Sequence, residues 1–384
     1  MVRRSSARVG VRDAMNPNCA IDASNTMTSR RHDPDEADAF ASRVLGMLNG
    51  GALALMLSIG HRAGLFDVMA GLEFATSAEI AEEAGLEERY VREWLGAMTT
   101  GAIVEYDAAR DAYRLPPAHA AALTRAAGQG NLAVTAQWIS LLGSVEDRVL
   151  DCFQHGGGVP YSAFDRFQQV MAEESDQTVV AALLDAILPL VPDRVAVLRD
   201  GADVLDVGCG SGRALNEMAA AFPASRFTGY DLSAAAIESA RAEARERGLG
   251  NVAFGVRDIA DLHGKAAFDL VTAFDAIHDQ ARPAAALVAV AGSLRSDGAF
   301  LMQESRGTSH VDQDAANPYA PLLYTVSCMH CTTVSLAAGG EGLGAMWGAE
   351  TARRMLAEAG FASVELKTLP HDPLNAYYIA RKAG

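Results

Sequence analysis

The chain has 384 residues, of which half are hydrophobic and 21% are charged. This composition excludes a largely disordered protein, and the length favours two or three domains. Asp and Glu outnumber Lys and Arg by 48 to 32, and the resulting net charge of −16 opposes binding to nucleic acid or to an anionic membrane.

Residues 1–36 are predicted to form a disordered tail. The first 31 residues carry six arginines and two aspartates, and they lack the apolar run of a signal peptide. The uncharged stretches at 44–60 and 315–340 contain asparagine with glycine or proline, so neither is predicted to span a membrane. Five scattered cysteines argue against a disulfide framework and indicate a cytoplasmic protein.

Residues 37–125 are predicted to form a winged-helix domain. Two apolar helices are expected first, through 40–48 and through 53–64. The run Thr76-Ser77-Ala78-Glu79 then places a hydroxyl cap ahead of a short helix at 80–84, and a longer helix follows over 88–100. Two short strands at 103–106 and 112–115 flank a polar turn and complete a helix, turn, helix and hairpin.

A winged helix raises DNA binding as a first hypothesis, because its second helix can enter a major groove. The charge of this segment opposes that role. Six arginines face eleven carboxylates between Ser42 and His119, and the would-be recognition helix is preceded and lined by Glu87, Glu88 and Glu93. We therefore expect a dimerisation module that also forms a wall of the substrate site, with no nucleic-acid partner.

Residues 126–195 are interpreted as a helical linker. The segment is apolar and periodic, and three glycines at 156–158 mark a loop in its middle. A strong helix is predicted over 179–187, leading into the next domain.

From residue 202 onward, short strands alternate with helices, which is typical of a parallel sheet with crossover helices. The predicted strands are 204–207, 226–230, 252–256, 268–274, 298–304, 364–367 and 376–380. The fold class is therefore α/β: residues 196–384 form a doubly wound, seven-stranded Rossmann-like domain, preceded by the helical and winged-helix domain.

A glycine-rich turn follows the first strand of this sheet and predicts a nucleoside site. Asp206 is followed by Gly208, Cys209, Gly210 and Gly212 in the spacing Asp-x-Gly-x-Gly-x-Gly. Glycine permits a tight turn and a close ligand approach, and the amides of the next helix face the ligand. The dinucleotide fingerprint spaces its third glycine one residue later.

Further cofactor contacts are expected along the same sheet edge. Asp231 ends the second strand, where an acid accepts hydrogen bonds from both hydroxyls of a ribose. Asp258 and Ile259 follow the third strand and are predicted to hold an adenine. The remaining predicted cofactor-binding residues, after the second strand and at the end of the fourth, are Leu232, Phe274 and Asp275.

Residues 204–212, Asp231, the pair Asp258-Ile259 and the final two strands resemble class I S-adenosylmethionine-dependent methyltransferases over 200–382. With the winged helix, the chain is similar to bacterial small-molecule methyltransferases and shares its layout with plant-type O-methyltransferases. The resemblance implies S-adenosyl-L-methionine as cofactor, S-adenosyl-L-homocysteine as product, a small-molecule acceptor and a homodimer formed through the winged helix.

Three side chains are candidate catalytic residues. His278 and Asp279 resemble the His-Asp pair of the plant-type enzymes, in which the histidine is the general base, although Gln280 replaces their usual Trp. Glu304 ends the fifth strand and either orients His278 or touches the acceptor. His330 lies in a predicted helical lid at about 307–350 and is the second candidate for the base.

The lid is expected to line a hydrophobic acceptor pocket with its apolar side chains, namely Leu322, Leu323, Met329, Val334 and Leu336. Cys328, His330 and Cys331 lie too close together for a zinc site, so no metal is predicted. Two alternatives to O-methylation stay open: N- or C-methylation of a small molecule, and an S-adenosylmethionine-responsive winged-helix regulator of transcription.

Overall fold

A computed structural model describes residues 34–262 and 266–383. Most of the predicted N-terminal tail lies outside the described residues, but its last three residues, 34–36, begin helix α1 (Pro34–Arg62). The chain divides into two compact units, up to Leu48 and from Asn49 onward, and each is described by itself.

Helix α1 is continuous, so the prediction of two separate helices was wrong. Gly50 and Gly51 lie inside it, and each glycine costs only about 1 kcal/mol in a helix interior, which weakens a helix without ending it. Within the described residues, Asp35–Arg62 is long and apolar enough to cross a membrane, with a mean hydropathy of 1.4. Core helices and signal sequences share these properties, so the absence of a membrane span stays a prediction.

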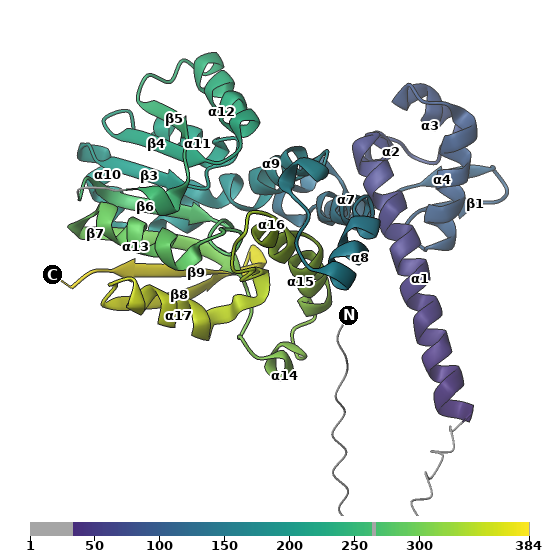
Figure 1. The fold of residues 1–384 in the computed structure, drawn as a ribbon. Coiled ribbons are helices and arrows are strands. Elements are labelled where there is room, and N and C mark those ends of the chain that lie inside the picture. Colours follow the sequence, from purple (N-terminus) through teal and green to yellow (C-terminus); the bar gives the residue numbers. More distant parts are fainter. Residues whose placement is uncertain (1–33, 263–265, 384) are drawn as a thin grey trace, which may run out of the picture. The chain divides into compact units, whose positions relative to one another are not determined.

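The winged-helix domain forms as predicted. Its elements are α2 (Leu65–Ala70), α3 (Ser77–Ala84), α4 (Glu88–Thr100), β1 (Glu105–Asp107), β2 (Ala112–Arg114) and α5 (Pro117–Leu123), as Figure 1 shows. Thr76 caps α3 in a reciprocal capping box with Glu79. The wing is an antiparallel pair in which Tyr106 lies opposite Tyr113.

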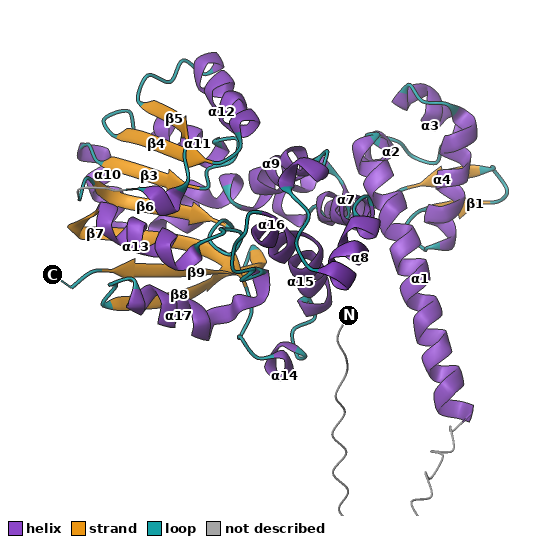
Figure 2. Ribbon diagram, in the orientation of Figure 1, coloured by secondary structure: helices purple, strands orange, loops and turns teal. Residues whose placement is uncertain are grey.

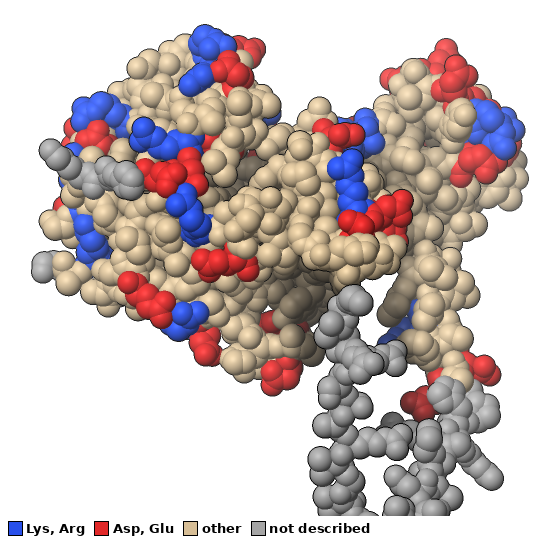
Figure 3. Space-filling view, viewed as in Figure 1, with Lys and Arg blue, Asp and Glu red and all other residues tan. Residues whose placement is uncertain are grey.

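Several arginines of this domain are paired with acids. On α4, Arg89 lies 2.6 Å from Glu93 and Arg92 lies 2.6 Å from Glu88. On the wing, Arg114 lies 2.5 Å from Glu105. The face drawn in Figure 3 accordingly shows blue and red side chains next to each other in this domain. Pairing with acids weakens the attraction of these arginines to phosphate, and the absence of a nucleic-acid partner stays a prediction.

The helical linker contains α6 (Leu132–Thr135), α7 (Gln137–Gly143), α8 (Glu146–His155), α9 (Phe167–Thr178) and α10 (Pro192–Asp200). The segment predicted as one regular helix over 179–187 is instead a 3₁₀ turn, a π-helical turn (Leu183–Ile187) and a second 3₁₀ turn. Pro189 lies in the last of these turns, and its nitrogen carries no hydrogen to donate to the carbonyl of Asp185, as a regular α-helix would require.

A seven-stranded sheet forms the centre of the C-terminal domain, as predicted (Figure 2). Its strands are β3 (Asp203–Val207), β4 (Arg226–Asp231), β5 (Val252–Val256), β6 (Phe268–Phe274), β7 (Leu294–Ser305), β8 (Ser363–Leu369) and β9 (Asp372–Arg381). The strand order is β5-β4-β3-β6-β7-β9-β8, and β9 is antiparallel to both of its neighbours.

Both faces of the sheet are covered by helices because successive strand residues point to opposite sides. Val204 and Leu301 face the core formed with α10, α11 (Arg213–Ala221) and α12 (Ala234–Glu246). Leu205 and Phe300 face the other core, formed with α13 (Pro283–Ser293) and α17 (Gly348–Glu358). Near-continuous apolar strands are the expected result of this double coverage.

The predicted lid is helical. It consists of α14 (Val311–Asp314), α15 (Ala320–Val326), a π-helical turn (Ser327–Cys331) and α16 (Thr332–Ala337), followed by a 3₁₀ turn at Ala345–Trp347. The insertion follows the C-terminal end of β7, the edge at which open α/β sheets bind their ligands.

Candidate active site

The turn after β3 requires its glycines for two different reasons. Gly208, Gly210 and Gly212 all have positive φ, between 52° and 73°. A Cβ on Gly208 would lie 2.4 Å from Cβ of Ala276, and one on Gly212 would lie 2.7 Å from Cβ of Ala240. A Cβ on Gly210 would meet no protein atom within 4 Å. Gly208 and Gly212 are fixed by packing, whereas Gly210 leaves open space for a ligand.

Asp231 holds this turn from the neighbouring strand. Its Oδ2 accepts a hydrogen bond from the amide of Gly210 at 2.9 Å, and its Oδ1 accepts one from the amide of Ser233 at 2.7 Å. The two amides lower the pKa of Asp231, but burial outweighs them and raises it. A carboxylate accepts about four hydrogen bonds, so acceptor capacity remains for two ribose hydroxyls.

Asp206 lies beneath the turn. Its side chain is buried and accepts a hydrogen bond from the Thr272 hydroxyl at 2.7 Å. Burial raises the pKa of Asp206 to about 7, and the bond from Thr272 only partly opposes this shift. Cys209 is half-buried, and its amide donates to the carbonyl of Tyr230 at 3.1 Å. These residues shape the turn from below.

The predicted adenine contacts are engaged within the protein. Oδ1 of Asp258 accepts from the amide of Ala260, and Oδ2 accepts from Arg282 at 2.8 Å. Ile259 is buried in the core beside α13, and Leu232 is 54% exposed. An adenine bound at Asp258 would therefore compete with Arg282, which the sequence did not indicate.

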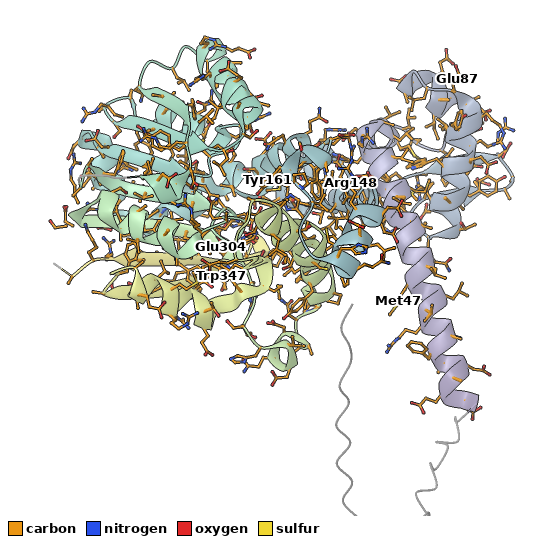
Figure 4. The ribbon with its side chains drawn as sticks, in the orientation of Figure 1. Met47, Glu87, Arg148, Tyr161, Glu304 and Trp347 are labelled. Carbon is orange, nitrogen blue, oxygen red and sulfur yellow. The ribbon has the colours of Figure 1, made fainter. Side chains whose placement is uncertain are left out.

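His278 is buried beyond the end of β6, next to Glu304 of β7. The two side chains form a short hydrogen bond between Nδ1 of His278 and Oε2 of Glu304. Glu304 also accepts from the amide of Ile277 at 2.9 Å and from Nε1 of Trp347 at 3.2 Å. Figure 4 shows Glu304 and Trp347 close together at this end of the sheet. The carboxylate is thus fixed by three donors and orients the imidazole.

The second nitrogen of His278 faces another acid. Nε2 lies 3.2 Å from Oδ1 of Asp279, and Tyr161 donates to Oδ2 of Asp279 at 2.7 Å. Burial alone would lower the pKa of His278, but Glu304 and Asp279 outweigh burial and raise that pKa well above its usual value. The site therefore stabilises the imidazolium form of His278.

Asp275 shares the pocket of His278. Its backbone has the unusual φ of 54°, and its Oδ1 lies 3.8 Å from Nδ1 of His278. Burial raises the pKa of Asp275 to about 7. Phe274 and Asp275 both line a cavity that adjoins the one at His278. The prediction that they contact the cofactor stays a prediction.

His330 lies on the π-helical turn of the lid, inside a group of aromatic rings. It stacks on Phe167 with ring centres 4.3 Å apart and contacts Trp138, Phe164 and Tyr161 edge-on. Burial lowers the pKa of His330 to about 4, so the ring is neutral near pH 7. Its Nε2 has no hydrogen-bond partner among the described residues.

The two histidines line one cavity. Asp275, Asp279 and Cys331 share its lining with apolar side chains of α9 and α15. Glu304 lies behind His278 and does not line it. Of the lid residues predicted to line the pocket, Leu322 and Leu323 contribute to this cavity or to the adjoining ones, whereas Val334 lies in a core and Leu336 is 39% exposed.

A tight backbone contact joins the glycine loop of the linker to the lid. A Cβ on Gly158 would lie 2.1 Å from the carbonyl oxygen of Thr333. The amide of the next residue, Val159, donates to the Thr333 hydroxyl at 2.6 Å. The loop and α16 are therefore in direct contact beside the cavity.

Sequence reasoning missed several residues of the site. Trp138, Tyr161, Phe167 and Trp347 carry no motif, and they reach the site only through the tertiary fold. The one available signal was the Gly-Gly-Gly-Val-Pro run before Tyr161, which indicated a loop and predicted no contact.

Two groups of three side chains in the described residues have the spacing of metal ligands: His278 with Asp279 and Cys331, and His278 with Asp275 and Glu304. Both include His278, whose Nδ1 is already bonded to Glu304. The prediction of no metal stays a prediction.

Comparison with known proteins identifies two domains. Residues 51–125 match the model of an Rv2258c-like winged HTH domain, and residues 198–360 match the model of a methyltransferase domain. A nocamycin O-methyltransferase from Saccharothrix syringae is 39% identical over 97 residues, which cover 25% of this chain and 31% of that protein. The match thus spans about a third of the curated relative.

Solved structures resemble the chain over most of its length. Human N-acetylserotonin methyltransferase in complex with SAM aligns with a TM-score of 0.64 at 17% identity, covering 92% of this chain and 99% of that chain. Mitomycin 7-O-methyltransferase aligns with a TM-score of 0.65 at 16% identity, covering 91% and 100%. At this identity the likeness establishes the fold.

Proposed function

We propose that this chain, which joins a winged HTH domain to a methyltransferase domain, is an S-adenosylmethionine-dependent enzyme. It methylates a hydroxyl group of a small, largely apolar molecule. One observation carries the proposal. The glycine turn after β3 packs on Ala276, two residues before His278, because β3 and β6 are parallel neighbours. A nucleoside held at the turn therefore lies beside a cavity that contains a buried histidine.

The residues at the turn fit the cofactor. The open space at Gly210 admits a ligand against the backbone, and Asp231 retains acceptor capacity for two ribose hydroxyls. When bound, S-adenosylmethionine supplies a methyl group on a positively charged sulfur, which transfers by in-line displacement. The chain has to position the acceptor oxygen and exclude water, since no covalent protein intermediate is needed.

His278 is proposed to take the proton of the acceptor hydroxyl. Glu304 occupies Nδ1, so Nε2 is the nitrogen that remains for the proton. Glu304 and Asp279 stabilise the imidazolium that forms, as the acid does in a catalytic triad. Because they also raise the pKa of His278, the neutral, reactive form becomes more abundant as pH rises.

Three features support a small apolar acceptor and oxygen as the methylated atom. The cavity is lined by aromatic and aliphatic side chains around the histidines. A buried base is suited to hydroxyl deprotonation. The sequence match to nocamycin O-methyltransferase agrees with transfer to oxygen.

Replacing Asp231 by alanine tests the cofactor assignment. The change removes two charge-assisted hydrogen bonds to the ribose, so we expect S-adenosylmethionine affinity to fall by about 10- to 100-fold. Isothermal titration calorimetry of the purified protein measures this loss. An unchanged dissociation constant would show that Asp231 does not bind the ribose, and failure of the parent protein to bind would refute the cofactor assignment.

We further propose that the N-terminal helix pairs with a second copy of the chain. Phe40, Leu45, Met47 and Leu48 are each more than half exposed, although they lie on a helix with many apolar residues. Double replacement of Leu45 and Leu48 by glutamate is expected to convert a dimer into a monomer in light scattering after gel filtration. A wild-type monomer at micromolar concentration would refute the pairing.

A further inference from the structure

The inner cavity adjoins two further cavities. A second cavity shares Asp275, Trp138 and Leu323 with it. A third shares Glu174, Thr178 and Leu374 with the second. We refer to these three adjoining cavities, which follow one another from His278 to Glu174 and beyond, as the channel.

The channel is acidic throughout. Its three cavities are lined by Asp275, Asp279, Glu174 and Asp372, and none of the described residues that line them is Lys or Arg. Near the reacting end, the charges of Asp275 and Asp279 face the imidazolium of His278. Asp372 is satisfied by neutral donors from Gln303, Asn375 and Tyr377.

Glu174 differs from these acids. It projects from α9 and lines both the second and the third cavity. It accepts hydrogen bonds only from Nε1 of Trp138 at 2.6 Å and from the Thr135 hydroxyl at 3.3 Å, and it forms no ion pair with any described residue. His371 lines the third cavity but does not pair with it.

Such a carboxylate has a defined ligand preference. Its two neutral donors leave about two of its four acceptor sites open. Burial raises its pKa, and no positively charged group of the described residues opposes that shift. The indole of Trp138, which donates to this carboxylate, lines the inner and middle cavities beside it.

We propose that the acceptor carries a cationic amine at the end opposite to its reacting hydroxyl, and that Glu174 binds this amine. This inference rests on the proposed function for the position of the hydroxyl at His278. Acceptors with a carboxylate at the same end are rejected, because the described residues that line the channel include several acids and no Lys or Arg.

A matched ligand series tests the proposal. The probes are 4-hydroxyphenylalkylamines of increasing chain length, each compared with the 4-alkylphenol and the 4-hydroxyphenylalkanoic acid of equal length. Binding is measured by calorimetry on the full chain saturated with S-adenosylhomocysteine, so no turnover is needed. At the best length, the amine is expected to bind at least about tenfold more tightly than the neutral phenol, and the acid most weakly.

Glu174→Gln separates charge from structure. The amide oxygen still accepts from Trp138, but the negative charge is gone, so the amine-to-neutral affinity ratio should fall to about one. Glu173→Gln is the matched control. Glu173 is the neighbouring acid on α9, bonded to His61 and Gln137, and it lines none of the three cavities. It should keep the wild-type ratio.

Two results would overturn the proposal: neutral phenols that bind as tightly as the amines at every length, or a Glu174→Gln protein that keeps the preference. Methyl transfer to the same probes is assayed separately. Amines that bind as expected but are never methylated would contradict the proposed O-methylation and leave the role of Glu174 standing. If the phenols are methylated but the amines do not bind more tightly, the proposed O-methylation stands and the role of Glu174 is contradicted.

Discussion

The two ends of the active site are built by different means. At the cofactor end, the binding groups are backbone amides and one carboxylate, and they lie within one turn and the neighbouring strand, from Asp206 to Ser233. At the acceptor end, side chains converge from β6, β7, the linker and the lid. The first end depends on local backbone geometry, whereas the second depends on charge balance between distant segments. Substitutions at the two ends should therefore fail in different ways.

Replacing His278 by alanine should have the largest effect and should separate the two ends most clearly. Turnover is expected to fall roughly 10²- to 10⁴-fold, because the proton acceptor is lost. The dissociation constant of S-adenosylmethionine should stay the same, since the turn after β3 is untouched. Steady-state kinetics with a phenol that the wild-type protein methylates measure turnover, and calorimetry measures the dissociation constant.

His330→Phe is the control for this experiment. Phenylalanine preserves the stack on Phe167 but has no ring nitrogen. If His278 is the base, the phenylalanine variant keeps far more activity than His278→Ala. Equal losses in both variants, or wild-type turnover in His278→Ala, would contradict the assignment.

Alanine at Gly208 and at Gly210 tests the cofactor end by itself. Gly210→Ala places a methyl group into the space left for the cofactor, so it should mainly weaken cofactor affinity, by about tenfold. The positive φ of residue 210 adds a conformational cost of about 1–2 kcal/mol. Gly208→Ala adds an overlap with Ala276 and should lower the free energy of unfolding by about 2–4 kcal/mol. Urea unfolding measures the loss of stability and calorimetry measures the loss of affinity, so together they distinguish the two variants. Equal stability losses would show that packing does not set the turn.

The smallest expected effect concerns the pH dependence of stability at Asp206. Its pKa is raised to about 7 in the folded protein, so the folded state holds a proton that the unfolded state has released. Stability without cofactor should therefore fall as pH rises from about 4 to about 7. Asp206→Asn should remove about 1–3 kcal/mol of this decline in urea unfolding. An unchanged slope would exclude Asp206 as its source.

The contrast between the two ends also explains how far the sequence could be interpreted. The glycine turn, Asp231 and the seven strands follow from local patterns, and the structure forms them at the predicted positions. His278, Glu304 and His330 were predicted as candidates, and contact between Glu304 and His278 was one of two alternatives that the sequence left open, because the bond between these side chains depends on how the sheet is assembled. Glu174 and Trp138 have no local signature, and only packing brings them to the cavity.

Some errors had equally local causes. The two glycines at 50 and 51 suggested a break in the first helix, but a helix interior tolerates them at a modest cost. The apolar run at 179–187 suggested a regular helix, but Pro189 lies just beyond it and the segment winds as 3₁₀ and π turns. In both cases the sequence correctly indicated a helical segment, but the predicted backbone geometry was wrong.

The contact at Gly158 couples the linker to α16. Since the Gly158 backbone lies directly against Thr333, and Val159 is bonded to the same residue, this seam opens only if both contacts break together. A side chain larger than hydrogen at position 158 would overlap the carbonyl oxygen of Thr333, so the loop would have to move away from α16 and would lose the bond from Val159. One added methyl group would thereby loosen two segments that lie far apart in the sequence.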